Sequence, residues 1–170
     1  MKKRAEKRNG NLFRPLIGIL LLGAFIYPAA SDAAPERAEG PATRFSDLTI
    51  TEIMYNPLNN PTNEFIEIYN TSPVDMDISG FQLKGEIDFT FPANTTLSGN
   101  RYIVVAKDTS TINGSKGPWL GSLNDAGGTI KLYSNHGVLH CHAEYNDNYL
   151  WPKAADGFGH SLVLARPDYG

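Results

Sequence analysis

Two histidines and a glutamate alternate along one short run of the sequence, at His140, His142 and Glu144. Successive side chains of a β-strand point to opposite faces, so these three would project from one face, about 6.5 to 7 Å apart in series. Zinc binds imidazole nitrogen and carboxylate oxygen atoms, which makes the three residues candidates for a metal site. The simpler interpretation, which we favour, is a strand whose polar residues face water. We therefore expect no bound metal or other cofactor, with zinc at these residues as the alternative.

Cys141 lies between the two histidines and is the only cysteine of the chain. Because neighbours in a strand point to opposite faces, neither histidine can activate this thiol as a nucleophile. A single cysteine also forms no disulfide within the chain. We expect Cys141 to be a small buried side chain, on the same face as Leu139, Ala143 and Tyr145.

Acidic side chains recur in two groups that could do chemistry. The first group could flank a glycosidic bond, as the carboxylate pairs of glycoside hydrolases do. The second could bind calcium through loop oxygen atoms, although it lacks the close spacing of a calcium-binding loop. We interpret them as solvated strand residues and turn caps, and expect no catalytic residue. The first group is Glu52, Glu64 and Glu67, and the second is Asp75, Asp77 and Asp125.

Four aromatic side chains lie in or beside two long connections, residues 109–127 and 146–159. Exposed aromatic residues often anchor an interface or form a platform for carbohydrate. We expect Trp119, Tyr149 and Phe158 to be exposed and to act as ligand or interface residues. Trp151, which precedes a proline, is expected instead to close one end of the fold.

The elements that position these residues are short runs rich in Ile, Val, Tyr, Phe and Thr, each bounded by Gly, Pro, Asn or Asp. Such runs are typical of β-strands, and no segment keeps a helical period. Short strands at this spacing favour two packed antiparallel sheets. Gly137 can adopt the left-handed conformation that a three-residue hairpin loop at 135–137 requires. The predicted strands span residues 47–55, 64–70, 80–85, 87–91, 101–108, 128–134, 138–145 and 160–166.

Alternation assigns side chains to faces within the first two predicted strands. In the first, Leu48, Ile50 and Glu52 would share one face. In the second, Ile66 and Ile68 would lie opposite to the side chains at positions 65, 67 and 69.

The chain begins with a basic segment, an apolar run from Leu16 to Tyr27 and then small residues such as Ala29 and Ala33. This order is that of a secretory signal peptide, which we assign to residues 1–33, with cleavage after Ser31 or Ala33. Twelve residues rise about 18 Å as a helix, less than the roughly 30 Å of a bilayer core, so we expect no membrane anchor in the mature chain. Residues 34–46 are predicted to be a linker.

The charge is distributed unevenly along the chain. The formal net charge is -3, but the residues from Asp32 onward contain 9 Lys and Arg against 17 Asp and Glu, a net charge of -8. Nucleic-acid binding normally relies on clustered Lys and Arg that neutralise phosphates. We therefore do not expect nucleic acid as a partner.

Five motifs stand in one order along the predicted strands. Together they resemble the lamin-tail domain (LTD) family, an immunoglobulin-like β-sandwich found in nuclear lamins and in exported bacterial proteins. The resemblance covers residues 47–166 and implies an all-β fold, an immunoglobulin-like antiparallel β-sandwich of about eight or nine strands, within residues 47–170. The motifs are ITEIMYNP (50–57), EFIEIYN (64–70), DISGFQL (77–83), FPANTTLSGNRYIVVAKD (91–108) and DGFGHSL (156–162).

The resemblance supplies architecture rather than catalytic residues, since lamin-tail domains generally act as non-catalytic interaction modules. It implies core positions at Ile50, Ile53, Phe65, Ile66, Ile68, Leu83, Val104, Ile130, Leu132 and Leu162.

These features predict a secreted, periplasmic or cell-surface binding module, whose loops contact an extracellular protein or polysaccharide. Two alternatives remain open. One is the N-terminal piece of a larger secreted enzyme, of spore-coat-kinase-like, nuclease or hydrolase type, with its catalytic part after Gly170. The other is a metal-dependent module that uses His140, His142 and Glu144.

Overall fold

The computed structural model describes residues 42–44, 47–148 and 150–165. Strands are the main elements of this part of the chain, and a single turn of 3-10 helix, η1, spans Lys153–Ala155. Within the described residues, no helix has the length and apolar character needed to cross a membrane. The predicted signal peptide, residues 1–33, lies outside the described residues, so export stays a prediction.

The larger of the two main sheets has six strands, and every neighbouring pair in it is antiparallel. Antiparallel pairing suits this chain because short loops can join neighbouring strands directly. Across the sheet the order is β1 (Ala42–Arg44), β11 (Leu139–Asn146), β10 (Gly127–Tyr133), β5 (Gln82–Gly85), β6 (Ile87–Thr90) and β9 (Leu120–Gly121).

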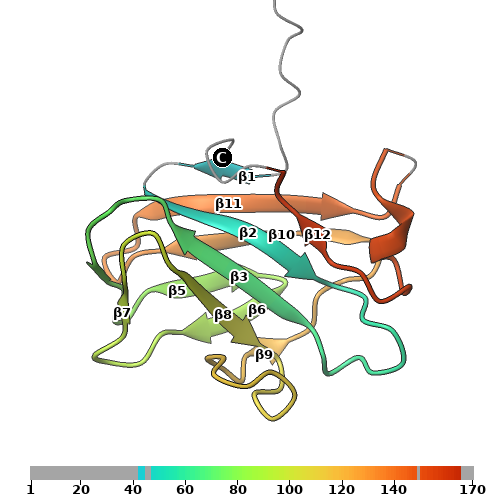
Figure 1. Cartoon of the computed structure of the whole chain (residues 1–170), viewed down its shortest axis with the longest axis horizontal. Helices are drawn as coiled ribbons and strands as arrows, with labels where there is room; N and C mark the ends of the chain where they lie inside the picture. The colour runs from blue at the N-terminus through green and yellow to red at the C-terminus, as the bar shows by residue number, and fades with distance from the viewer. Residues whose placement is uncertain (1–41, 45–46, 149, 166–170) are drawn as a thin grey trace, which may run out of the picture. The chain divides into compact units, whose positions relative to one another are not determined.

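The second main sheet has four strands and lies across the first (Figure 1). Its order is β12 (Leu162–Val163), β2 (Leu48–Met54), β3 (Phe65–Asn70) and β8 (Tyr102–Ala106). A small third sheet pairs β4 (Met76–Asp77) with β7 (Thr96–Leu97). This is the predicted antiparallel β-sandwich, and each of the eight predicted runs overlaps one of its strands. The additional strands β1, β4, β7 and β9 have only two or three residues.

The hydrophobic core lies between the two main sheets and draws buried side chains from both. Of the core positions implied by the resemblance, Phe65 and Val104 are only half-buried, because each lies on the outer face of its strand. Val105, the neighbour of Val104, is fully buried instead. The confirmed core positions are Ile50, Ile53, Ile66, Ile68, Leu83, Ile130, Leu132 and Leu162.

A β-bulge in β2 changes which residues face the core. The pairing with β3 shifts between Ile50 and Glu52, so that one extra residue, Thr51, lies in the bulge. Ile50 and Ile53 both face the core although they are three residues apart, and Glu52 lies on the outer face. The prediction that Glu52 shares a face with Ile50 is therefore wrong, whereas the predicted alternation along β3 is confirmed.

The hairpin that joins β10 to β11 has the predicted loop. Gly137 has a φ of 77°, in the left-handed region, and its N–H donates to the carbonyl oxygen of Ser134 at 3.0 Å. The N–H of Ser134 in turn donates to the carbonyl oxygen of Val138 at 2.8 Å. These two bonds close the loop and fix the pairing of the two strands.

The sandwich begins earlier in the chain than the sequence indicates. Residues 42–44, part of the predicted linker, form strand β1 and pair with β11, with Ala42 opposite Ala143. Edge pairing needs only backbone N–H and C=O groups, so these residues carry no alternation of side chains that would reveal a strand.

Candidate functional site

Strand β11 carries the candidate metal ligands, and a β-bulge separates the first of them from the other two. The pairing of β10 with β11 shifts beyond Leu132, which lies opposite Cys141, and the shift takes His140 out of the regular alternation. The His140 ring packs against Phe81 of the core, with ring centroids 4.9 Å apart. Burial lowers the pKa of His140, which favours its neutral form.

The other two candidate ligands remain on the outer face of the larger sheet. His142 lies opposite Lys131, and Glu144 lies opposite Thr129. The prediction that all three side chains share one face is therefore wrong for His140. In the described part of the chain, no group of three His, Cys, Asp or Glu side chains is placed to hold a metal ion.

Cys141 lies on the core face of β11 and is fully buried. Burial raises the pKa of its thiol to about 12, which leaves very little of the reactive thiolate at neutral pH. The predicted buried role is confirmed. Ala143 and Tyr145 share the core face as expected, whereas Leu139, at the bulged end of the strand, is half-buried.

We expect iodoacetamide to leave Cys141 unmodified in the folded protein at about pH 8, because the thiol is both inaccessible and protonated. Unfolding in guanidinium chloride should expose the thiol and allow complete labelling, which mass spectrometry of the intact chain would measure. Rapid modification of the native protein would contradict the buried position of this residue.

The glutamates of β2 and β3 act within the smaller sheet. Glu52 and Glu67 lie directly opposite each other. The hydroxyl of Thr51 donates to Glu67 at 2.7 Å, and the hydroxyl of Ser161 donates to Glu52. Each of these two carboxylates thus accepts a hydrogen bond from a hydroxyl group of another segment of the chain. Glu64 does not lie opposite them, as an acid–base partner would. Glu64 is 3% exposed, so the expectation that it is solvated is wrong.

Glu64 is the centre of a buried polar contact between β3 and the connection at residues 109–127. Lys107 Nζ donates to its Oε1 at 2.7 Å, and the hydroxyl of Ser122 donates to the same oxygen at 2.9 Å. The N–H of Leu123 donates to its Oε2 at 2.9 Å. Lys107 also donates to the hydroxyl of Ser122. The bonds from Ser122 and Leu123 therefore fix the end of this long connection against the sandwich, and Lys107 supplies the neutralising charge.

Two of the aspartates proposed as calcium ligands accept hydrogen bonds from backbone N–H groups instead. Asp75 accepts a hydrogen bond from the N–H of Gly99 at 2.9 Å, and Asp77 accepts one from the N–H of Ser79 at 2.9 Å. The bonds from Ser79 lower the pKa of Asp77. Asp125 lies exposed in a different turn. The turn-capping interpretation is confirmed for Asp77, whereas Asp75 links two connections that are 24 residues apart in the chain.

The aromatic interface candidates have three different outcomes. Trp119 is 5% exposed and belongs to the hydrophobic core, so the prediction of a surface residue is wrong. Tyr149 lies outside the described residues. Phe158 is 71% exposed, as predicted. Trp151 is half-buried and packs against the core, in agreement with its expected place at one end of the sandwich.

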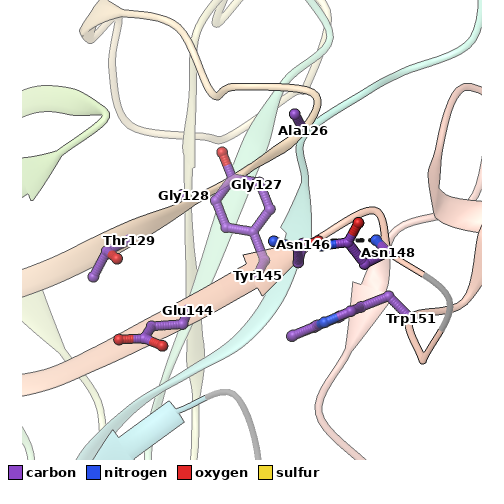
Figure 2. Close-up of a pocket in the computed structure, with 9 residues that line it drawn as sticks. All are labelled: Ala126, Gly127, Gly128, Thr129, Glu144, Tyr145, Asn146, Asn148 and Trp151. Atoms are coloured by element: carbon purple, nitrogen blue, oxygen red, sulfur yellow. Dashed lines mark hydrogen bonds between the residues drawn. The ribbon is translucent and has the colours of Figure 1, made fainter.

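A shallow groove of about 550 Å³ lies where β10 begins and β11 ends (Figure 2). Gly127 and Tyr145 lie in its centre, Glu144 toward one side, and Asn148 and Trp151 toward the other (Figure 2). The side chain of Glu144 is exposed. The groove therefore combines the indole ring of Trp151, the side-chain amide of Asn148, the carboxylate of Glu144 and the backbone of two glycines.

Hydrogen bonds fix the turn that forms one wall of the groove. The N–H of Asn148 donates to the side-chain oxygen of Asn146 at 2.9 Å, and the N–H of Trp151 donates to the carbonyl oxygen of Asn148 at 2.8 Å. On the inner side, the hydroxyl of Tyr145 accepts a hydrogen bond from the N–H of Asn124 at 2.8 Å. The pKa of Tyr145 is raised, mainly because its hydroxyl is buried.

The segment 146–159 was predicted from the sequence, but the strand residues that complete this groove were not. The signals were weak: the pair Gly127 and Gly128 at the start of one strand, and a turn-forming Asn-Asp-Asn at 146–148 after the next. Only the pairing of Gly127 with Asn146 shows that the two signals lie together.

The two antiparallel sheets with a shared core define an immunoglobulin-like β-sandwich. The family model of the Lamin Tail Domain matches residues 41–147, and the chain belongs to this family of non-catalytic, immunoglobulin-like domains. The match begins one residue before β1 and ends after β11, while β12 still completes the smaller sheet. No curated protein sequence matches the chain at a significant level.

Proposed function

We infer that this protein is an exported binding module that contacts an extracellular or cell-surface partner through its loops at 109–127 and 146–159. Membership of the lamin-tail family supports an interaction role, and the signal-like order of residues 1–33 supports export. Binding by such a module requires surface complementarity and no chemical step.

The observation that carries this proposal is the contrast between anchored and exposed side chains within each loop. In the first loop, Trp119 is buried while Leu120 is 76% exposed. In the second, Trp151 packs against the core while Leu150 is 90% exposed and Phe158 is 71% exposed. Because the anchored tryptophan holds the neighbouring backbone in place, each loop loses less backbone entropy on binding, which favours a contact surface.

Export is tested by expressing the full chain in a bacterial host and sequencing the N-terminus of the protein outside the cytoplasm. We expect the exported chain to begin at Asp32 or Ala34, after cleavage by signal peptidase. Retention of the uncleaved chain in the cytoplasm would refute the exported location.

Binding is tested by mixing the purified chain with isolated cell envelopes of the source organism and measuring the bound fraction. We expect the double variant Leu150→Ser and Phe158→Ser to bind about tenfold more weakly, because both exposed anchors are lost. Val138→Ser is the matched control: Val138 is 60% exposed but lies in the hairpin loop at the other end of β10 and β11. Equal binding by all three proteins would refute a contact through the loop at 146–159.

A further inference from the structure

The groove between β10, β11 and the turn before Trp151 has the composition of a sugar-binding site, and we propose that it binds a neutral polysaccharide. This inference rests on the proposed binding function and names its ligand class and its place.

Glycine allows β10 and β11 to approach closely at the groove. Gly127 has a φ of 119°, and a Cβ there would lie 2.6 Å from the carbonyl oxygen of Tyr145 and 2.9 Å from the side-chain nitrogen of Asn146. A side chain at this position would therefore disturb the pairing of β10 with β11. Gly127 therefore permits the close approach of the two strands at the groove and adds no side chain to its lining.

Trp151 supplies an apolar platform at one side of this groove. Its indole is half-buried and packed against the core, so its position is fixed before any ligand binds. A pyranose ring presents its C–H groups on one face, and the electron-rich face of an aromatic ring attracts them. Figure 2 shows Trp151 near Asn148, beyond the end of β11, and both residues line the groove.

The polar side chains match the hydroxyl groups at the rim of a sugar ring. Each hydroxyl both donates and accepts hydrogen bonds, so its best partners are groups that do one or both. Glu144 offers acceptors, the amide of Asn148 offers a donor and an acceptor, and Thr129 offers a hydroxyl. The side-chain oxygen of Asn146 already accepts a hydrogen bond from the N–H of Asn148. This bond does not use the amide N–H groups of Asn146.

Size and charge narrow the ligand class. A volume of about 550 Å³ is within the range of small-ligand sites, which suits a segment of a chain rather than an extended surface. Glu144 in the groove and the net charge of -8 after the predicted signal segment repel anionic polymers. A neutral polysaccharide satisfies the polar groups without this repulsion.

The test measures binding of the purified full chain to insoluble cellulose, β-1,3-glucan and chitin, with anionic alginate for comparison. We expect binding to at least one neutral polymer and none to alginate. Trp151→Ala, Asn148→Ala and Glu144→Gln should each weaken this binding about tenfold or more. Asn135→Ala is the matched control, because Asn135 is exposed in the hairpin loop at the other end of β10 and β11 and lies outside the groove.

Trp151 also packs against the core, so Trp151→Ala can lower stability, and the melting temperature of each variant is measured alongside. If Trp151→Ala does not fold, the exposed positions Asn148 and Glu144 decide the test. Binding to a neutral polymer that none of the folded groove variants weakens would overturn the proposal.

The proposed binding function and this inference fail in different ways. If the chain binds cell envelopes but no neutral polymer, or if protease treatment of the envelopes abolishes binding, the polysaccharide site is overturned. The general binding function then still stands. If the chain binds neither envelopes nor neutral polymers, both are overturned.

Discussion

Replacing Lys107 by methionine will lower the free energy of unfolding by about 3 kcal/mol, because it leaves the Glu64 carboxylate buried without its cation. The two charged groups lie 2.7 Å apart, and the Glu64 side chain is only 4% exposed. Removing one partner of such a pair lowers the stability by more than the intact pair adds to it, because the remaining charge stays buried and unsolvated. Unfolding in urea, followed by circular dichroism, measures this loss.

Lys84→Met is the matched control for this prediction. Lys84 forms an ion pair with Asp88 at 2.6 Å, but these side chains are 37% and 55% exposed. Exposed pairs contribute less than about 1 kcal/mol, because water screens them and solvates either partner when the other is removed. A similar loss of stability in both variants would contradict the importance of burial at Glu64.

The Lys107 substitution should also loosen the connection at residues 109–127. Ser122 and Leu123 hydrogen-bond to the same carboxylate, and both geometries depend on where Glu64 is held. We expect faster hydrogen exchange at Leu123 in Lys107→Met and no change there in Lys84→Met. Unchanged exchange at Leu123 would mean that the backbone of this connection is held by other contacts.

The local features of this fold are readable from the sequence. Alternation and turn residues predict where every strand except the short β1, β4, β7 and β9 lies in the chain. Gly137 predicts the hairpin loop between β10 and β11. These signals depend on neighbours in the chain, since a strand alternates with a period of two and a turn needs particular backbone angles.

The bulges could not be predicted, because they depend on the partner strand. The residues at Thr51 and His140 look like regular strand positions in the sequence. Only the register against β3 and β10 shows that each is an extra residue, and one such residue reverses the faces that follow. This is why Glu52 and His140 were assigned to the wrong faces.

Long-range contacts explain the remaining differences. Trp119 lies in a long connection with no strand pattern, and it is buried because the Glu64 contact and the pairing of β9 with β6 hold that connection against the core. Glu64 and Lys107 are 43 residues apart, and nothing near either residue indicates the other. The groove likewise joins strand residues to a turn, and only the folded register brings Gly127 beside Asn146.

Gly85→Ala will destabilise the protein by about 4 kcal/mol or more, a large part of the 5 to 15 kcal/mol typical of a domain. Gly85 has a φ of 119°, and a Cβ there would lie 2.0 Å from the carbonyl oxygen of Thr129 in β10. That oxygen belongs to the backbone of a central strand and cannot rotate away. β5 and β10 would have to separate beside the pairing of Gly85 with Ile130.

Gly137→Ala separates this clash from the cost of the backbone angle alone. Gly137 also has a positive φ, of 77°, but a Cβ there would meet nothing within 4 Å. We expect Gly137→Ala to cost only about 1 to 2 kcal/mol, the usual penalty of a left-handed residue with a side chain. Urea unfolding of both variants measures the difference. Equal losses would show that conformational strain explains both effects, and would contradict the close approach of β5 and β10 at Gly85.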